Sequence, residues 1–336
     1  MDDLVNFGIV GLGHIGLRHA KHVVENKRAL LKSVCDILPI ENLDISTNEI
    51  ALHSNYLDML NDDEVDVVNI CTPNYLHASM AIDVLKSGKH VLIEKPMALS
   101  TIDSKKIIET SKKENKLVFC VMQNRFSPTI EWLKKIVTEG ILGKIKMISV
   151  NCFWNRNNDY YQKSNWHGSL EKDGGPLFTQ FSHFIDVIFW LFGAIKNVDT
   201  NFYNFNKKKF IEFEDSGIVR LDFQNDIKGV IQYSTAIWNK NFESSITVIG
   251  DRGTVKIGGQ YMDELLYCDI ENYKAPSFEN KIFCNDYGSY KGSASNHDKV
   301  IDNVISVLKD KKNINTTALD GHNVVKIIEK IYLNRN

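Results

Sequence analysis

Short apolar runs alternate with longer amphipathic stretches over the first 120 residues of the chain. Apolar runs bounded by turn residues predict buried strands, and the amphipathic stretches between them predict helices. The predicted strands cover 5–10, 31–35, 66–71, 91–93 and 117–121, and the predicted helices include 56–60, 76–86 and 100–115. This alternation with short connections is typical of a doubly wound parallel sheet. We therefore predict a Rossmann α/β domain over residues 1–122.

The pattern changes from Gln123 onward, where strand-like segments follow one another without long helices between them. The predicted strands cover 146–154, 219–223, 230–235, 245–249 and 254–257, and the predicted helices cover 128–139, 176–192 and 318–333, with another ending near residue 309. Consecutive strands joined by tight turns indicate a mainly antiparallel sheet. We predict that residues 123–336 form an α+β domain for substrate binding and oligomerisation.

Composition excludes some classes of protein. The 336 residues suffice for two domains with large cores. With 40 basic and 42 acidic residues the net charge is −2, which gives no electrostatic case for nucleic acid or an anionic membrane. The six cysteines form no C-x-x-C pair, and the longest apolar run, 184–195, is too short to span a bilayer. We expect reduced thiols, no leader, no membrane segment, no metal and a cytoplasmic location.

Glycines with dinucleotide-binding spacing follow the first predicted strand. Gly11, Gly13 and Gly16 form a G-x-G-x-x-G sequence between a strand and a helix, which is the context that this motif requires. The first glycine permits a tight turn, the second lets a pyrophosphate approach the backbone, and the third lets the helix pack closely. The helix N-terminus then offers unpaired N–H groups to the phosphates. The motif predicts a dinucleotide site.

Asp36 ends the second predicted strand, where a carboxylate accepts hydrogen bonds from the adenosine ribose. A carboxylate there repels a 2′-phosphate, and no arginine follows in 37–39, so NAD is favoured over NADP. The expected cofactor-binding residues are Gly11, Gly13, His14, Ile15, Gly16, Asp36, Thr72, Pro73, Asn74, Glu94, Lys95 and Gln123.

The predicted strand 91–93 runs into Glu94, Lys95 and a proline. A lysine at the carboxyl end of a parallel strand faces the crevice where open sheets bind ligands. The alternative interpretation is a surface Glu–Lys pair. Two histidines of the first predicted helix, His19 and His22, are interpreted as solvated residues rather than metal ligands. His77 is interpreted as a cap or packing residue.

The predicted helix 176–192 carries a polar stripe. Thr179, His183 and Asp186 fall at positions i, i+4 and i+7, which places them on one helix face. An imidazole titrates near neutral pH, so His183 is a candidate general base that Asp186 would orient. A core histidine satisfied by Asp186 is the alternative.

A long polar and aromatic loop covers residues 154–168. A loop of this length is unusual unless it has a function. Arg156, Tyr160 and Tyr161 suit the binding of phosphates and the stacking of rings. The alternative is an exposed loop whose aromatic residues belong to an interface.

Together these motifs resemble the Gfo/Idh/MocA family of sugar oxidoreductases. The resemblance spans essentially the whole chain and rests on the glycine motif, Thr72-Pro73-Asn74, Glu94-Lys95-Pro96 and the Gly-rich approach to His183. It implies that Lys95 and His183 line the substrate site and that the Lys-Pro peptide is often cis. Many relatives carry an aspartate where this chain has Thr179, so the resemblance does not imply a Lys-Asp-His arrangement.

The segments 122–128, 151–156 and 173–186 are also similar to the UDP-N-acetyl-2-amino-2-deoxyglucuronate dehydrogenases within that family. This similarity implies oxidation of the sugar C3 hydroxyl to a ketone, in the synthesis of bacterial surface polysaccharide such as the O-antigen of lipopolysaccharide. It also implies a homo-oligomer, a tetramer or dimer, with 2-oxoglutarate as a reoxidant in some relatives.

The expected substrate-binding residues are Lys95, Arg156, Tyr160, Thr179 and His183. Lys95 and His183 are the expected catalytic residues, with the histidine as base and the lysine as polariser of the developing oxyanion. Three alternatives stay open at this point: a dehydrogenase for another nucleotide sugar, a dehydrogenase for a free polyol such as inositol, or a non-catalytic NAD-binding sensor.

Overall fold

The computed structural model describes residues 4–39, 50–206, 209–278, 284–286 and 291–334. The chain divides into two compact units. The first unit comprises residues 1–122 and 297–325, and the second comprises 123–296 and 326–336. The two expected domains change at the same place, between residues 122 and 123, but the sequence pattern assigns 297–325 to the second domain. These residues pack in the first unit instead.

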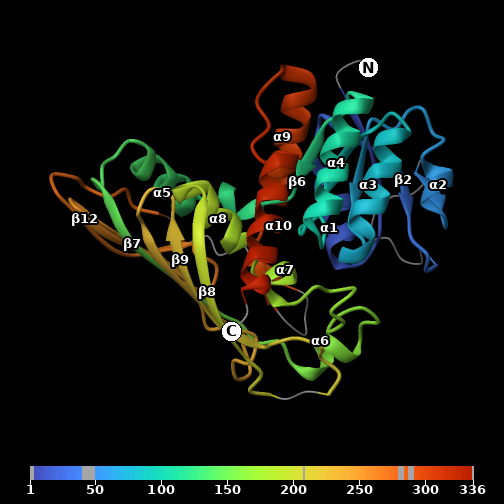
Figure 1. The fold of residues 1–336 in the computed structure, drawn as a ribbon. Coiled ribbons are helices and arrows are strands. Elements are labelled where there is room, and N and C mark those ends of the chain that lie inside the picture. The colour runs from blue at the N-terminus through green and yellow to red at the C-terminus, as the bar shows by residue number, and fades with distance from the viewer. Residues whose placement is uncertain (1–3, 40–49, 207–208, 279–283, 287–290, 335–336) are drawn as a thin grey trace. The chain divides into compact units, whose positions relative to one another are not determined.

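The first unit contains a six-stranded parallel sheet (Figure 1). In spatial order its strands are β3 (Ala51–His53), β2 (Ala29–Cys35), β1 (Val5–Val10), β4 (Val67–Ile70), β5 (His90–Ile93) and β6 (Val118–Cys120). The order runs outward in both directions from the neighbouring strands β1 and β4. Such a reversal is the point where open α/β sheets bind ligands, at the carboxyl ends of the strands.

Helices follow these strands as the alternating pattern predicts. They are α1 (His14–Glu25), α2 (Tyr56–Met59), the 3₁₀ helix η1 (Asn74–Leu76), α3 (His77–Lys86) and α4 (Thr101–Glu114). Helix α4 begins where the Ser100 hydroxyl accepts the Asp103 N–H at 3.0 Å, and it ends at Asn115 in the left-handed region, with φ 51°. Local capping therefore fixes both of its ends.

Helix α9 (His297–Asp310) explains why the C-terminal segment joins the first unit. One face of α9 buries Val300, Ile301, Val304 and Ile305, and the helix packs against α1. An amphipathic helix is stable only when a partner covers its apolar face. The chain then reaches β6, where the Cys120 N–H donates to the Thr316 carbonyl at 3.0 Å. The last helix, α10 (Ala318–Leu333), begins in the first unit and ends in the second.

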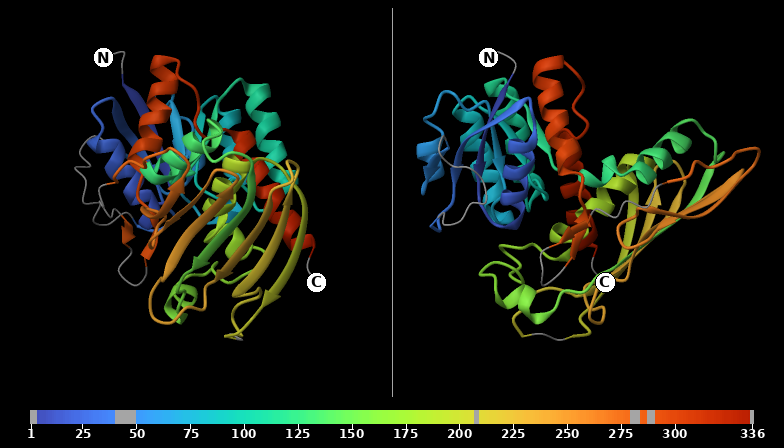
Figure 2. Two further views of the ribbon diagram at one scale, coloured as in Figure 1. Left: turned by 90° about the vertical axis from the view of Figure 1, so that its left-hand side faces the viewer. Right: turned by 180° about the vertical axis from the view of Figure 1, so that it is seen from behind.

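The second unit is built on a seven-stranded sheet (Figure 2). In spatial order its strands are β13 (Glu264–Ile270), β12 (Gly253–Gly258), β11 (Glu243–Gly250), β7 (Ile145–Phe153), β10 (Lys228–Ser234), β9 (Ser216–Phe223) and β8 (Ile195–Tyr203). Strands β14 (Cys284–Asp286) and β15 (Lys291–Ala294) form a separate antiparallel pair. Only the β7–β10 pair of this sheet is parallel. The predicted mainly antiparallel sheet is therefore confirmed.

Helices α5 (Pro128–Thr138) and α8 (Ser182–Phe192) lie along one face of this sheet and pack against each other (Figures 1 and 2). The second unit also contains the short helices η2 (Gln123–Phe126), α6 (Asn158–Gln162) and α7 (Pro176–Thr179). The strands bury Ile148, Val150 and Val219 among others, whereas alternate side chains such as Met147 and Ile218 are exposed. This period of two means that one sheet face belongs to the core and the other faces outward.

The single helix predicted over 176–192 is wrong, because the chain forms two helices there. The first, α7, ends at Thr179, and α8 begins at Ser182 after Phe181, which has φ −107° and ψ 3°. The Gln180 side chain points away into the loop and donates to the Tyr160 hydroxyl at 2.7 Å. The helical spacing of Thr179 and His183 therefore does not place them on a common helix face.

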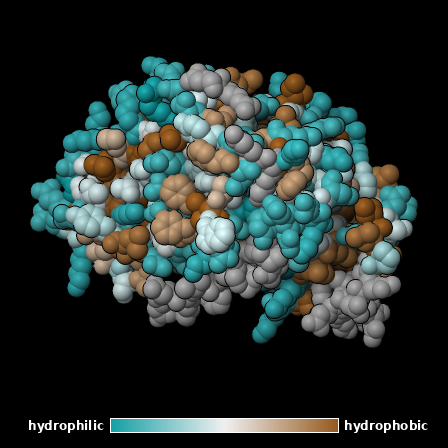
Figure 3. Space-filling view, turned by 90° about the horizontal axis from the view of Figure 1, so that it is seen from below, coloured by the Kyte–Doolittle hydropathy of each residue, from teal (hydrophilic) through white to brown (hydrophobic). Residues whose placement is uncertain are grey.

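Exposed apolar side chains occur in both units and include Leu57, Met147, Ile218, Ile249 and Trp238. On the face drawn in Figure 3, apolar and hydrophilic residues are interspersed. Among the described residues, no helix is both long and apolar enough to cross a membrane.

Candidate functional site

The glycine turn after β1 has the geometry of a phosphate-binding turn. Gly11 has φ +87°, and a Cβ on Gly16 would lie 1.8 Å from the Gly11 carbonyl oxygen, so both positions require glycine. A Cβ on Gly13 would meet nothing within 4 Å. Gly13 also starts α1 without a side-chain cap, which leaves the first N–H groups of that helix for a ligand. The residues present therefore fit a dinucleotide.

Asp36 follows β2 and is fixed beside this turn. One carboxylate oxygen accepts the Leu12 N–H at 2.6 Å, and the other accepts the Leu38 N–H at 2.9 Å. The half-buried carboxylate is thus held at the edge of the glycine turn, where the sequence predicts the ribose contact. Its negative charge at this position disfavours a 2′-phosphate.

The turn after β4 is tied to the end of β5 by His77. The Nδ1 atom of this buried histidine lies 2.7 Å from the Pro96 carbonyl oxygen, and Nε2 lies 2.8 Å from the Thr72 carbonyl oxygen. The pKa of His77 is lowered, because the effect of burial outweighs that of the two carbonyl acceptors, which raise it. His77 is the packing residue that the sequence predicts, and it joins two segments that the sequence predicts to bind the cofactor.

Glu94, Lys95 and Pro96 follow β5, and the Lys95–Pro96 peptide is cis. Glu94 is buried, with 5% of its surface exposed, so the alternative of a surface Glu–Lys pair is wrong. One Glu94 oxygen accepts the Lys95 backbone N–H at 3.1 Å, and the other lies 3.0 Å from His19 Nε2. His19 is therefore also buried, which corrects its interpretation as a solvated residue.

The first unit thus brings several expected residues to one edge of its sheet. The glycine turn, Asp36, Thr72-Pro73-Asn74 and Glu94-Lys95 follow the carboxyl ends of β1, β2, β4 and β5 respectively, and these strands are parallel neighbours or next neighbours. Lys95 belongs to this unit, whereas Gln123, Arg156, Tyr160, Thr179 and His183 belong to the second.

In the second unit, His183 lies on α8 close to η2. The Gln123 side-chain nitrogen is 3.4 Å from His183 Nε2, and both side chains are 2% exposed. The expected orienting contact from Asp186 is wrong. Both oxygens of that carboxylate instead accept from Arg125, at 2.8 and 2.5 Å. Sequence reasoning missed Arg125, although its position beside Gln123 in a buried segment was a signal.

Thr179 is buried and uses its hydroxyl within the second unit. The hydroxyl donates to the backbone carbonyl of Asp173 at 3.0 Å and to the Asp173 carboxylate. The other oxygen of that carboxylate accepts the Gly168 N–H at 2.8 Å. These contacts connect the end of α7 to the end of the long loop.

Arg156 and Tyr160 are packed together in that loop. The Arg156 guanidinium lies 5.0 Å from the Trp154 ring centroid and 5.2 Å from that of Tyr160, and it donates to the Asn155 carbonyl at 2.6 Å. The imidazole of His167 stacks on Tyr160 with centroids 4.2 Å apart. Tyr160 and Tyr161 are 7% and 4% exposed, so the alternative of an exposed aromatic loop is wrong for these two rings.

Two family models match the chain. A model described as an oxidoreductase family with an NAD-binding Rossmann fold matches residues 5–122, and a model of the GFO/IDH/MocA C-terminal domain matches residues 130–256. The matched ranges together cover more than half of the chain. The first range contains the glycine turn, Asp36 and Lys95, so the first unit is an NAD-binding Rossmann domain.

The chain is also similar to individual proteins. The crystal structure of the WlbA dehydrogenase from Bordetella pertussis, in complex with NADH and UDP-GlcNAcA, matches with TM-score 0.87 and 30% identity, and the match covers 98% of this chain and 96% of that one. An uncharacterized oxidoreductase from Synechocystis sp. is 27% identical over 232 residues, which cover 66% of this chain and 62% of that protein, less than two thirds of its length. Inositol 2-dehydrogenase from Salmonella paratyphi B is 30% identical over 189 residues, which cover 55% and 53% of the two chains.

Proposed function

Because this chain belongs to the Gfo/Idh/MocA family of oxidoreductases, we propose that it is an NAD-dependent dehydrogenase that oxidises the C3 hydroxyl of UDP-N-acetyl-2-amino-2-deoxyglucuronate. The product would be the 3-keto nucleotide sugar, made in the cytoplasm for bacterial surface polysaccharide that contains a 2,3-diamino uronic acid. The observation that carries this proposal is the 30% identity, over nearly the whole chain, to a dehydrogenase crystallised with NADH and UDP-GlcNAcA.

The first unit supplies the cofactor site. Bound NAD accepts a hydride at its nicotinamide. The glycine turn and the N-terminus of α1 would hold the pyrophosphate, and Asp36 would accept from the ribose hydroxyls. We assign Thr72-Pro73-Asn74 and Glu94-Lys95 to the same site, because they follow the adjacent strands β4 and β5 at the same sheet edge.

We assign the proton chemistry to His183 and Lys95. His183 accepts the proton of the C3 hydroxyl, and the nearby amide of Gln123 fixes the orientation of the imidazole ring. Lys95 donates a hydrogen bond to the developing oxyanion, and its backbone is anchored by Glu94 on one side and by His77 at Pro96 on the other. General-base action of this kind typically contributes about 10²–10⁴-fold in rate.

We assign the UDP group to the loop that carries Arg156 and Tyr160. Arg156 is a buried cationic residue of this segment, whereas Lys163 is exposed and pairs with Asp159. The planar guanidinium of Arg156 suits a diphosphate. The ring of Tyr160, which packs against this guanidinium, would hold it in position. Thr179 is the last proposed substrate-binding residue. Its hydroxyl bonds to Asp173, and the Asp173 carboxylate holds the end of this loop at Gly168.

The decisive assay offers the purified protein a panel of nucleotide sugars and free polyols with NAD and follows NADH by its absorbance. UDP-N-acetyl-2-amino-2-deoxyglucuronate should be turned over with the highest kcat/KM. Preference for inositol, which the similarity to inositol 2-dehydrogenase makes the second candidate, would replace the proposal. No turnover with any member, despite NAD binding, would identify a sensor. Adding 2-oxoglutarate to the same assay tests whether it reoxidises bound NADH.

The first prediction concerns the proposed base. His183→Asn should lower kcat by roughly 10²–10⁴-fold while changing the Kd of the nucleotide sugar much less, because only proton transfer is lost. Arg156→Ala is the matched variant. It should weaken the binding of UDP, measured by calorimetry, because it removes a binding residue and not the base. A His183→Asn protein with the parent's kcat would remove the histidine from the mechanism, and unchanged UDP binding by Arg156→Ala would remove the arginine.

A further inference from the structure

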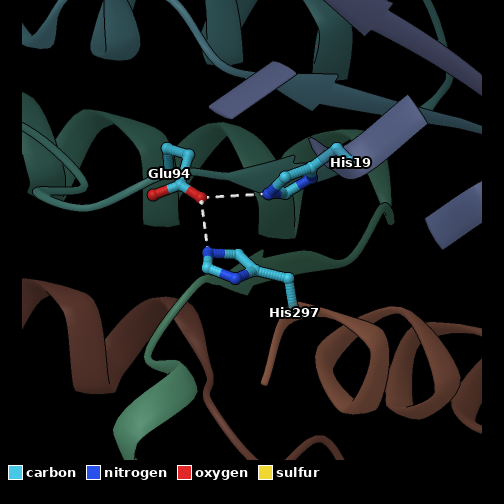
Figure 4. A group of neighbouring side chains, drawn as sticks. All are labelled: His19, Glu94 and His297. Atoms are coloured by element: carbon cyan, nitrogen blue, oxygen red, sulfur yellow. Dashed lines mark hydrogen bonds and ion pairs between the residues drawn. The ribbon is translucent and has the colours of Figure 1, made fainter. Parts of the chain in front are cut away.

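Three side chains that the proposed reaction does not use as acid or base meet inside the first unit (Figure 4). They are His19 from α1, Glu94 after β5, and His297 at the start of α9, and they are 1%, 5% and 1% exposed. Each offers one ligand atom, and these three atoms lie within 4.8 Å of one another. Figure 4 shows both imidazoles pointing at the same carboxylate oxygen.

The buried imidazole of His297 needs an explanation. Among the residues that the structure describes, neither of its ring nitrogens has a hydrogen-bond partner. Its Nε2 lies 3.6 Å from Glu94 Oε1, which is too long for a hydrogen bond. Leaving a buried polar atom unsatisfied typically costs about 1–3 kcal/mol, so such an atom in a native protein often marks a bound water or ion.

The three side chains supply donor atoms that suit a cation. Two imidazole nitrogens and one carboxylate oxygen lie together in the buried interior of the first unit. Imidazole and carboxylate are ligands that divalent transition-metal ions take in proteins.

Asn69 of β4 provides the outer contact that metal-binding histidines usually have. Its side-chain amide lies 3.1 Å from His19 Nδ1, and its Oδ1 has no hydrogen-bond partner among the described residues. A half-turn of the amide, whose two ends are distinguished only by their hydrogen bonds, lets Oδ1 accept the Nδ1–H of His19. The Nε2 lone pair of His19 is then directed at the cluster, as in the carboxamide or carboxylate support of metal-bound imidazoles.

We propose that His19, Glu94 and His297 bind one divalent cation of the class that takes imidazole and carboxylate ligands, with Zn²⁺ as its representative. Ligand bonds of about 2.0–2.2 Å in a tetrahedral site place neighbouring donor atoms about 3.3–3.5 Å apart. The observed separations of 3.0 Å, from His19 to Glu94, and 3.6 Å, from His297 to Glu94, lie on either side of this range. The donor atoms of His19 and His297 lie within 4.8 Å of each other, so a bound ion would draw the two imidazoles together.

The proposed ion has a structural role. It joins α1, the end of β5 and the first residue of α9, and so fixes the C-terminal segment 297–325 to the Rossmann sheet. Glu94 also accepts the Lys95 N–H, so the ion would brace the backbone next to that lysine. The inference does not depend on the substrate, and its test measures metal binding without turnover.

The experiment uses the full chain, treated with a chelator, desalted and given equimolar Zn²⁺. Mass spectrometry after gel filtration should find one Zn²⁺ per chain, and Zn²⁺ should raise Tm by several degrees, because an ion that binds only the folded state stabilises it. Co²⁺ should give visible absorption bands. His297→Gln and Glu94→Gln should each lower the affinity at least 10-fold. His22→Gln on the same helix, whose side chain faces Glu25 near the surface, should bind as the parent does.

Retention of no Zn²⁺ by the parent protein, or an equal loss in His22→Gln, would overturn the site. A variant that fails to fold is recognised by its circular dichroism spectrum and by its elution in gel filtration. In that case the test uses the parent protein alone: crystals are grown with Zn²⁺, and anomalous diffraction is measured at the zinc absorption edge. An anomalous peak among His19, Glu94 and His297 supports the proposal, and its absence from that position refutes it.

Discussion

At the scale of single residues, two glycines of one turn have different physical reasons to be glycine. A Cβ on Gly16 would collide with the Gly11 carbonyl, whereas a Cβ on Gly13 would occupy open space. Gly13 has φ −64°, which any residue adopts. The requirement at position 16 is therefore one of packing within the protein, and we propose that bound NAD sets the requirement at position 13.

The second prediction separates these requirements. Gly16→Ala should lower the free energy of unfolding of the NAD-free protein by at least about 1–3 kcal/mol, because the backbone must move to admit the methyl group. Gly13→Ala should leave that stability nearly unchanged but weaken NAD binding at least 10-fold. Urea unfolding and NAD titration measure the two effects. Equal stability losses in both variants would contradict the distinction.

His90 is a second residue whose surroundings determine a measurable property. Its Nδ1 accepts the Leu117 N–H at 2.9 Å, and burial, helped by Lys116, lowers its pKa from 6.5 to about 4. The unfolded chain takes up this proton near pH 6.5, but the folded chain takes it up only near pH 4. Acidification through this window therefore favours unfolding, and stability rises with pH within it.

The third prediction follows from His90. The parent protein should lose stability between pH 6.5 and 4 more steeply than His90→Gln, since glutamine does not titrate. The difference in free energy of unfolding between the two proteins should shrink as the pH falls. Urea midpoints measured across this window test the expectation. Parallel pH profiles would assign the acid sensitivity to other groups.

At the scale of elements, the ion pair between Arg125 and Asp186 joins η2 to α8. Both groups are buried, with 4% and 0% of their side chains exposed, and the contact is bidentate. Trp190 on α8 also lies under the guanidinium, 5.2 Å from its centre. The pair thereby holds the segment that carries Gln123 against the helix that carries His183.

The fourth prediction concerns this pair. Asp186→Asn should lower the free energy of unfolding by roughly 3–5 kcal/mol, because it leaves a buried guanidinium without its counter-charge. Asp222→Asn, which breaks the exposed cross-strand pair with Lys228, should change stability little. Replacing both partners, as Arg125→Met with Asp186→Leu, should recover most of the loss. Equal effects of the Asp186 and Asp222 changes in urea unfolding would contradict the assigned role.

The elements also show what the sequence pattern can and cannot predict. Strands buried on both sides, such as β1 and β4, are mainly apolar runs and were predicted correctly. The edge strands β8 and β13 were missed, because neither buries a regular alternation of side chains: β8 is largely polar, and β13 exposes Leu266 and Tyr267. The break at residues 180–181 was also missed, since no glycine or proline marks it. It depends on contacts such as that between Gln180 and Tyr160.

The candidate site was predictable to the extent that local motifs specify it. The glycine turn and its position between β1 and α1 follow from spacing alone. The partner of Asp186 cannot be predicted from spacing, because Arg125 is distant in sequence. The helical spacing pointed to His183 instead. The burial of His19 was equally hidden, since the residues that cover it come from β4, β5 and α9. Long-range packing decides such contacts, and a single sequence does not record it.

At the scale of the whole molecule, the outward face of the second unit's sheet is the surface on which we propose that copies of the chain associate. It exposes Ile218, which is 44% exposed, and the cross-strand pair Met147 and Ile249, at 53% and 38%. Polar residues such as Asn151 and Gln232 lie between them on neighbouring strands. A sheet face of mixed character that exposes aliphatic side chains is suited to an interface between identical subunits.

The fifth prediction tests this association. The parent chain should run as a dimer or tetramer in gel filtration with light scattering, and Ile218→Lys should shift it toward the monomer, because a charge is costly to bury in the interface. Leu57→Lys is the matched control, since Leu57 is 48% exposed but lies on α2 of the first unit. A monomeric parent protein, or an equal shift in both variants, would exclude this face as the interface.

Residues 297–325 belong to the first unit but are synthesised after almost all of the second unit, so the first unit cannot be completed until translation is nearly finished. A ribosome completes β1 to β6 long before it makes α9 and Thr316, the partners of α1 and β6. The nascent Rossmann half therefore leaves the side of α1 that binds α9 uncovered while the whole second sheet is translated. In this period normally buried surface attracts chaperones or other chains. A transcript cut short after that sheet would yield a polypeptide whose first half never closes.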